Sequence, residues 1–105
     1  MVKEVNWSSR AKIDLFDILE YWKHRNQSST YSGKLFDLFE QNLNSIKEHP
    51  GIGKITYYKG VRLKIVKNYL LVYYFKQEYV YLITIWDSRR DPKQLKKIIK
   101  NDTPK

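Results

Sequence analysis

The spacing of apolar residues changes near the middle of the chain, from a helical period to a strand-like one. Val2 to Trp7 is a short alternating run that predicts an opening strand. Ser8 and Ser9 are candidate N-caps, and two apolar stripes at helical spacing follow, separated by the polar segment Asn26 to Thr30. The stripes are Ala11, Leu15, Ile18, Leu19 and Trp22, then Leu35, Leu38, Phe39, Asn42 and Ile46. Together they predict an antiparallel helical hairpin that ends at His49-Pro50-Gly51.

Three strand-like runs follow the hairpin, joined by short turn signals. They cover residues 61–65, 69–75 and 79–86, are rich in β-branched and aromatic residues, and predict an antiparallel meander. In the first run, Val61, Leu63 and Ile65 alternate with Arg62 and Lys64. We expect the three apolar residues to meet the helical hairpin. The two cations should then project from the opposite, open face of the sheet.

A short terminal helix is predicted after the last strand. Pro92 can begin it, with Leu95, Ile98 and Ile99 on one side and four lysines on the other. The element order is therefore β-α-α-β-β-β with a short C-terminal helix. This order predicts an α+β fold in which the helical hairpin packs on an antiparallel sheet, as a single domain over residues 1–105.

Composition narrows the chemistry. The 105 residues include no cysteine, and the two histidines, His24 and His49, fit no metal-ligand spacing. Phosphate-binding glycine loops, HExxH helices and GxSxG elbows are absent from the sequence. No apolar stretch approaches the ~20 residues of a membrane span, and no signal-peptide pattern opens the chain. We expect a cytoplasmic protein with no metal, no cofactor and no membrane partner.

The net charge of +9 lies entirely in the second half of the chain. Residues 1–53 carry seven Lys and Arg against seven Asp and Glu, whereas residues 54–105 carry thirteen against four. Seven of the nine tyrosines also lie in the second half. A basic, aromatic-rich half suits phosphate contact and base stacking. This asymmetry favours an anionic partner, either nucleic acid or an acidic protein.

Candidate binding residues gather at the end of the last strand. Arg89 and Arg90 stand between Trp86 and the helix begun by Pro92, where a rigid sheet can present cations to solvent. Asp87 and Asp91 flank them. We expect one arginine to pair locally and the other to be available for binding, and Asp91 to cap the helix.

A second candidate group lies on the expected open face of the sheet. Arg62 and Lys64 lie two residues apart on one strand, and the meander could bring them toward Tyr74, Arg89 or Arg90. Such cations could hold a phosphodiester and stabilise charge during its cleavage. An ordinary polar outer face of a half-covered sheet is the alternative explanation.

Several segments along most of the chain stand in a specific order and spacing. These are Trp7 before a helix with Ala11-Lys12-Ile13-Asp14-Leu15 and Ile18-Leu19-Glu20-Tyr21-Trp22, then His49-Pro50-Gly51-Ile52-Gly53, Gly60-Val61-Arg62, Lys67-Asn68-Tyr69-Leu70-Leu71-Val72-Tyr73-Tyr74, Val80-Tyr81-Leu82-Ile83-Thr84-Ile85 and Arg89-Arg90-Asp91-Pro92. In these segments the chain resembles the RelE/ParE superfamily, the toxins of bacterial type II toxin–antitoxin systems. The superfamily fold, a helical hairpin on an antiparallel sheet, matches the pattern described above.

The resemblance implies a growth-inhibiting toxin that a cognate antitoxin neutralises, a pairing associated with plasmid stabilisation. RelE-like members cut mRNA on the ribosome, and ParE-like members poison DNA gyrase. Arg62 and Lys64 match two basic residues of a RelE strand, but Leu70 stands where RelE has its catalytic arginine, and no tyrosine follows Tyr81. The ending Arg89-Arg90-Asp91-Pro92 is more similar to ParE.

The resemblance therefore favours a ParE-like toxin, with Arg62, Lys64, Tyr74, Arg89 and Arg90 as target- or antitoxin-binding residues. Two alternatives stay open. One is a ribosome-dependent endoribonuclease with Arg62, Lys64 and Arg89 or Arg90 as catalytic candidates. The other is an inactive member that only binds an antitoxin. In each case we expect tight, salt-sensitive association with an acidic antitoxin, because the basic half offers a complementary surface.

Overall fold

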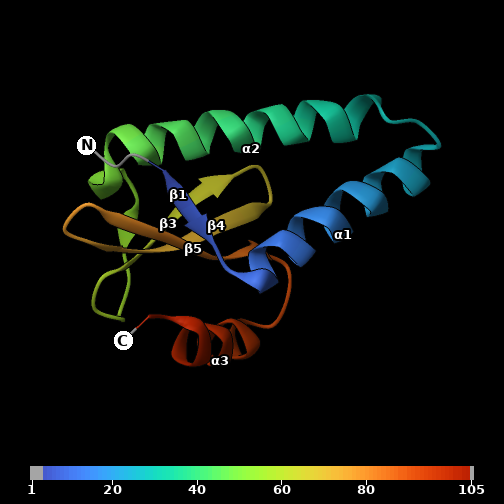
Figure 1. Ribbon diagram of the computed structural model, residues 1–105. Helices are drawn as coiled ribbons and strands as arrows, with labels where there is room; N and C mark the ends of the chain where they lie inside the picture. The colour runs from blue at the N-terminus through green and yellow to red at the C-terminus, as the bar shows by residue number, and fades with distance from the viewer. Residues whose placement is uncertain (1–3, 105) are drawn as a thin grey trace.

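The computed structural model describes residues 4–104 as a single sheet with helices on both faces (Figure 1). The strands are β1 (Val5–Trp7), β2 (Lys54–Ile55), β3 (Val61–Val66), β4 (Tyr69–Lys76) and β5 (Tyr79–Asp87). The helices are α1 (Ser9–Asn26), α2 (Thr30–Glu48) and α3 (Pro92–Asp102), with a 3-10 turn η1 (Pro50–Ile52) after α2. The predicted α+β fold and its helical hairpin are confirmed. Val2, where the predicted first strand began, lies outside the described residues.

The sheet has the strand order β1-β5-β4-β3-β2. Strands β3, β4 and β5 form the predicted antiparallel meander, and β1 joins the edge of β5 in parallel. Lys67 and Gln77 adopt left-handed backbone angles in the two tight turns of the meander (φ 58° and 56°). Strand β2 was not predicted, because a two-residue strand leaves no readable alternation. It pairs with Arg62 and Leu63 of β3 and extends the opposite edge of the sheet.

Local signals fix the ends of the hairpin. The Ser8 hydroxyl accepts a hydrogen bond from the Ala11 N–H (2.9 Å), so Ser8 is the N-cap of α1. Gln27 ends α1 in a left-handed conformation (φ 49°), and Pro50 stops α2 after His49. Among residues 4–104, no helix is both long and apolar enough to cross a membrane.

The hairpin covers one face of the sheet and builds the larger core. Leu35, Phe39, Leu43 and Ile46 of α2 pack with Ala11 of α1 against this face. The sheet contributes Val66, Tyr69, Leu71, Tyr73, Val80, Leu82 and Ile85, and the alternation in β5 is interrupted between Leu82 and Ile85, opposite the register shift at Val72 and Tyr73. Because Val66 belongs to this set, the side chains two and four positions earlier, Lys64 and Arg62, project from the same face as the hairpin.

Helix α3 covers the opposite face, so the expectation of an open face was wrong. Val61, Val72, Ile83 and Trp86 form a second core with Ile98 and Ile99 of α3, and Leu63 packs against it (Figure 1). Val61 and Leu63 therefore meet α3 rather than the hairpin, and Ile65 is exposed. The alternation in β3 was correctly recognised but assigned to the wrong faces. Both faces of this sheet are apolar, so alternation alone does not decide which side meets which helix.

Candidate functional site

A rigid turn presents the two arginines at the end of β5. The Ser88 N–H donates to the Asn68 carbonyl of the β3–β4 turn (2.8 Å), and the Arg90 N–H donates to the Asp87 carbonyl (3.0 Å). Asp91 then caps α3 by accepting from the Lys93 N–H (2.9 Å), as predicted. Backbone hydrogen bonds on both sides of the turn hold Arg89 and Arg90 on fixed structure rather than on a loose loop.

Arg89 is engaged by its neighbour Asp87. The guanidinium donates two hydrogen bonds to the carboxylate, from Nε at 3.0 Å and from Nη2 at 2.8 Å, and the Arg89 N–H donates a third at 2.9 Å. These bonds hold the pKa of Asp87 below its usual value and raise the pKa of Arg89. The pair is solvent-exposed on the arginine side. Its charges largely neutralise each other, so Arg89 matches the local pairing expected of one arginine.

Arg90 is held by an aromatic ring instead of a carboxylate. Its guanidinium carbon lies 4.2 Å from the centroid of the Trp86 ring, which is buried in the second core. A longer hydrogen bond runs from Nη2 to the Gln94 side chain (3.3 Å). Stacking on a ring fixes the plane of the guanidinium, and in residues 4–104 no carboxylate forms an ion pair with it. Of the two arginines, Arg90 therefore has the geometry better suited to an anionic partner.

A cleft of about 350 Å³ opens beside these arginines, between the end of the sheet and α1. Its lining residues are Asp14, Asp17, Ile18, Tyr21, Tyr69, Ile85, Asp87, Arg89 and Arg90. The Tyr69 hydroxyl accepts a hydrogen bond from the Trp22 indole (2.8 Å), and burial raises its pKa. The cleft thus combines aromatic walls, two cations and three carboxylates, a mixture suited to a peptide or protein side chain.

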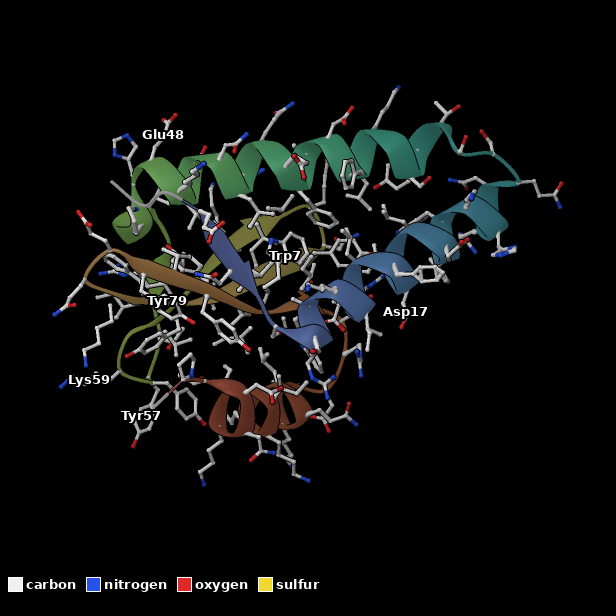
Figure 2. The ribbon with its side chains drawn as sticks, viewed as in Figure 1. Trp7, Asp17, Glu48, Tyr57, Lys59 and Tyr79 are labelled. Carbon is white, nitrogen blue, oxygen red and sulfur yellow. The ribbon has the colours of Figure 1, made fainter. Side chains whose placement is uncertain are left out.

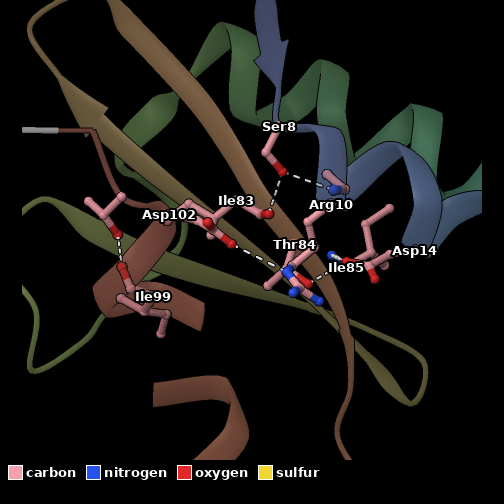
Figure 3. A network of polar contacts seen from close by, with 10 residues as sticks. Ser8, Arg10, Asp14, Ile83, Thr84, Ile85, Ile99 and Asp102 are labelled. Carbon is pink, nitrogen blue, oxygen red and sulfur yellow. Dashed lines mark hydrogen bonds and ion pairs between the residues drawn. The ribbon is translucent and has the colours of Figure 1, made fainter. Parts of the chain in front are cut away.

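Asp14 contributes to this cleft and also completes the edge of β5 (Figure 3). Where β1 stops pairing with β5, the Asp14 carboxylate accepts hydrogen bonds from the Thr84 hydroxyl (2.5 Å) and the Ile85 N–H (3.2 Å). The Ser8 hydroxyl donates to the Ile83 carbonyl beside it (2.6 Å). Burial raises the pKa of Asp14 despite these bonds. Asp14 is not part of the apolar stripe predicted for this helix, and no sequence signal marked its role.

The candidates on β3 and β4 do not join the arginines of the strand end. Arg62 donates to the carbonyls of Gly53 (2.9 Å) and Gly51 (3.2 Å), so it holds the η1 segment. Lys64 lies on the same face, opposite Leu71, whereas Tyr74 packs into the α3 side of the sheet. The expected patch of Arg62, Lys64 and Tyr74 on one face is therefore wrong.

Arg62 also lies far from Arg89 and Arg90. Arg62 pairs with Tyr73 and Asp87 pairs with Tyr69, so the two positions differ by four residues along the sheet and by two strands. Strand geometry makes that roughly 16 Å between backbones. Within residues 4–104, no three His, Asp or Glu side chains gather to hold a metal ion.

These features define a small basic α+β protein whose last strand ends in a rigid turn that carries two arginines. The family model described as "ParE toxin of type II toxin-antitoxin system, parDE" matches residues 5–92, and the chain belongs to this family. A solved structure titled "Chromosomal ParDE TA system from P. aeruginosa" shares the fold, with a TM-score of 0.69 at 15% sequence identity over 80% of this chain and 94% of that one. No curated protein matches the sequence.

Proposed function

We propose that the protein inhibits bacterial growth by acting on DNA gyrase and that a cognate antitoxin neutralises it. The observation that carries this proposal is the family match over residues 5–92, which spans the hairpin, the whole sheet and the turn with Arg89 and Arg90. It places the chain among toxins of type II systems. The target and the antitoxin are inferred from that membership together with the geometry of the strand end.

The strand end supports binding as its mode of action. Arg90 is fixed on Trp86 with its charge uncompensated by any carboxylate bond, and a cleft with aromatic walls opens next to it. An exposed, pre-positioned arginine beside such a cleft is the kind of residue that dominates protein interfaces. We assign Arg90 the direct contact with the target or antitoxin, and Arg89 the supporting role of shaping the turn with Asp87.

The alternative of an mRNA endoribonuclease receives less support from the geometry. Its candidate cations were Arg62, Lys64 and one of Arg89 and Arg90. The Arg62 guanidinium is bonded to two backbone carbonyls at the other end of the sheet. A phosphodiester held by Arg90 would therefore find neither Arg62 nor Tyr74, because Arg90 rests on Trp86, which pairs with Leu70, and Tyr74 lies four residues further along β4.

Induced expression without an antitoxin tests the proposal. We expect growth to stop, plasmid supercoiling to fall and mRNA to remain uncut. Arg90→Ala should restore growth at equal protein level. The control is Lys34→Ala, which removes an exposed cation from α2 and should leave the growth arrest unchanged. Growth arrest with mapped mRNA cleavage and normal supercoiling would instead support the endoribonuclease. If growth is unaffected although the protein is expressed, the remaining hypothesis is an inactive family member that only binds an antitoxin.

The antitoxin partner has a separate test. We expect the protein encoded next to this chain to be small and acidic, to bind tightly and to restore growth when co-expressed. Because charge complementarity contributes to the association, the affinity should weaken as salt rises and should weaken further in Arg90→Ala. An affinity unchanged by salt and by both Arg89→Ala and Arg90→Ala would contradict a role for this strand end in antitoxin binding.

A further inference from the structure

Helix α3 carries a row of lysines that the core and the strand end do not use. Lys93, Lys96, Lys97 and Lys100 recur at the helical spacing of one face and are all exposed, while Ile98 and Ile99 on the other face are buried. Within residues 4–104, none of these four lysines forms an ion pair. The helix begins at Pro92, where the family match ends, so this row lies outside the matched segment.

A cationic hollow adjoins the lysine row. It has a volume of about 350 Å³ between α3 and the start of α1, and Arg10, Arg90 and Lys97 contribute three positive charges to its lining. Asp102 is the carboxylate in that lining, and it is paired with Arg10 (Nε to Oδ2, 3.3 Å). Gln94 and Asn101 add amide donors. The hollow therefore keeps an excess of positive charge and of donors, which suits a phosphate.

We propose that this α3 face, made of Lys93, Lys96, Lys97, Lys100 and Arg10, binds the phosphate backbone of double-helical nucleic acid. Seven residues separate Lys93 from Lys100, so the row is about 10 Å long. That length covers about three base-pair steps at 3.4 Å per phosphate along one strand. The lysine row follows the backbone, and the hollow beside Lys97 receives one phosphate. Contacts of this kind are independent of base sequence.

The buried side of α3 argues against a membrane surface as the partner. A helix that lies on a lipid surface inserts its apolar face, but here Ile98 and Ile99 are committed to the second core. A protein partner is also disfavoured. Lysine is depleted from protein interfaces, and α3 exposes no large apolar side chain to anchor one.

The distribution of aromatic residues favours a duplex over a single strand. Single-strand binding relies on aromatic side chains that stack on bases, and the exposed face of α3 has none. Tyr57, labelled in Figure 2 and 96% exposed on the loop before β3, contacts the ring of Tyr58, which packs against the core that α3 completes. Tyr57 is therefore the aromatic residue that a single strand would use. The two modes therefore depend on different residues, which an experiment can separate.

The test compares two variants of equal net charge. The 105-residue chain, made by cell-free synthesis, is titrated with a fluorescent DNA duplex of about 20 base pairs and arbitrary sequence. The salt concentration runs from about 50 to about 200 mM, the range over which phosphate contacts lose most of their affinity. The first variant, Lys93→Gln/Lys97→Gln/Lys100→Gln, removes three cations from the α3 face. The second, Lys12→Gln/Lys23→Gln/Lys34→Gln, removes three from the exposed side of the hairpin.

We expect the α3 variant to bind roughly tenfold or more weakly, with a salt slope smaller by about 2.7, because each phosphate contact contributes roughly 0.9. The hairpin variant should bind like the unmodified chain. Equal weakening in both variants, or no binding by the unmodified chain at 50 mM salt, would overturn the proposal and leave the row as a solvated surface. Loss of binding in Tyr57→Ala, together with a preference for single strands, would also overturn the proposal.

Thermal unfolding verifies that both variants fold. Duplex binding by α3 does not rest on the proposed function, because the titration uses purified components and reads neither growth nor gyrase activity.

Discussion

The two ends of the sheet each carry arginine and tyrosine, but they use these residues in opposite ways. At one end, Arg62 donates to the carbonyls of Gly51 and Gly53, and the buried Tyr73 hydroxyl donates to the Pro50 carbonyl (2.5 Å) and accepts from the Gly53 N–H (3.0 Å). At the other end, Arg90 rests on a ring and keeps its charge toward solvent. The first end closes the fold, whereas the second presents an exposed cation, to which we assign partner binding.

The difference arises from the backbone near each arginine. The segment after α2 breaks regular hydrogen bonding at Pro50 and leaves carbonyls that need donors, and Arg62 and Tyr73 supply them. The turn after β5 satisfies its own backbone with Asn68, Asp87 and Asp91. A cation near unsatisfied carbonyls becomes structural, whereas a cation beside a self-contained turn remains available. The following predictions test that distinction.

The largest effect is expected from Gly53→Ala. A Cβ at this position would lie 2.6 Å from the Tyr73 hydroxyl and 2.9 Å from the Leu63 carbonyl oxygen, so the closed end would have to open. We expect a loss of about 3 kcal/mol in the free energy of unfolding, measured by urea denaturation. Gly51→Ala is the matched control, because nothing lies within 4 Å of its added Cβ. Equal losses in the two variants would contradict the tight packing at Gly53.

Tyr73→Phe should have the next largest effect. It removes the hydroxyl that bonds both Pro50 and Gly53, and it leaves the buried Gly53 N–H without that partner. We expect a loss of about 2 kcal/mol in unfolding free energy. Tyr69→Phe, which removes one bond to the Trp22 indole, should cost about 1 kcal/mol. If Tyr73→Phe lowers the unfolding free energy no more than Tyr69→Phe does, the Tyr73 hydroxyl does not hold the segment from Pro50 to Gly53 as proposed.

A third prediction separates stability from activity between the two arginines. Arg62→Met keeps the aliphatic stem but removes the donors to Gly51 and Gly53, and we expect it to lower the unfolding free energy by about 1 kcal/mol. Arg90→Ala loses an exposed cation–π contact worth about 0.5 kcal/mol. Growth arrest should follow the reverse order, retained in Arg62→Met and lost in Arg90→Ala. Loss of toxicity in a stably folded Arg62→Met would contradict the division.

The smallest effect is expected from pH at Asp14. Its pKa is raised by burial, so the folded state holds this proton more tightly than the unfolded chain does. The contribution to stability is therefore present below the unfolded pKa, falls as pH rises through the folded pKa and then stays constant. Asp14→Asn removes this titration.

The measurement compares urea denaturation of both proteins from pH 3.5 to 7, the range that brackets the titration of a carboxyl group. The stability of the unmodified chain relative to Asp14→Asn should decrease as pH rises. Asp87, whose pKa is lowered mainly by its bonds to Arg89, gives the opposite trend, but it is common to both proteins and cancels. A relative stability that increases with pH would contradict the raised pKa.

The elements of this fold were predictable because each carries a strong local signal. Ser8, Pro50 and Pro92 mark helix boundaries, and the apolar stripes of α1 and α2 define the hairpin. The local pairing of one arginine with an aspartate, and the cap at Asp91, also followed from neighbours in sequence. These features depend on residues only a few positions apart, which a sequence displays directly.

The assignment of faces was not predictable, because it depends on what packs on each side of the sheet. Strand β3 is apolar at Val61 and Leu63 and also at Val66, so either face could have met the hairpin. The partners of Arg62 were hidden for the same reason, since Gly51 and Gly53 approach it only when the chain folds back. Asp14 contacts Thr84 and Ile85 across seventy residues or more. Contacts at that separation leave no mark on local periodicity.

Helix α3 separates two roles, packing on its inward side and positive charge on its outward side. Its inward residues complete a core whose other members, Val61, Val72, Ile83 and Trp86, all lie within the family-matched segment. Its outward residues make no contact with that core, so they can mutate without loss of packing. The charge of this layer can therefore be changed by substitution while the hairpin, the sheet and the Arg89–Arg90 turn keep their packing.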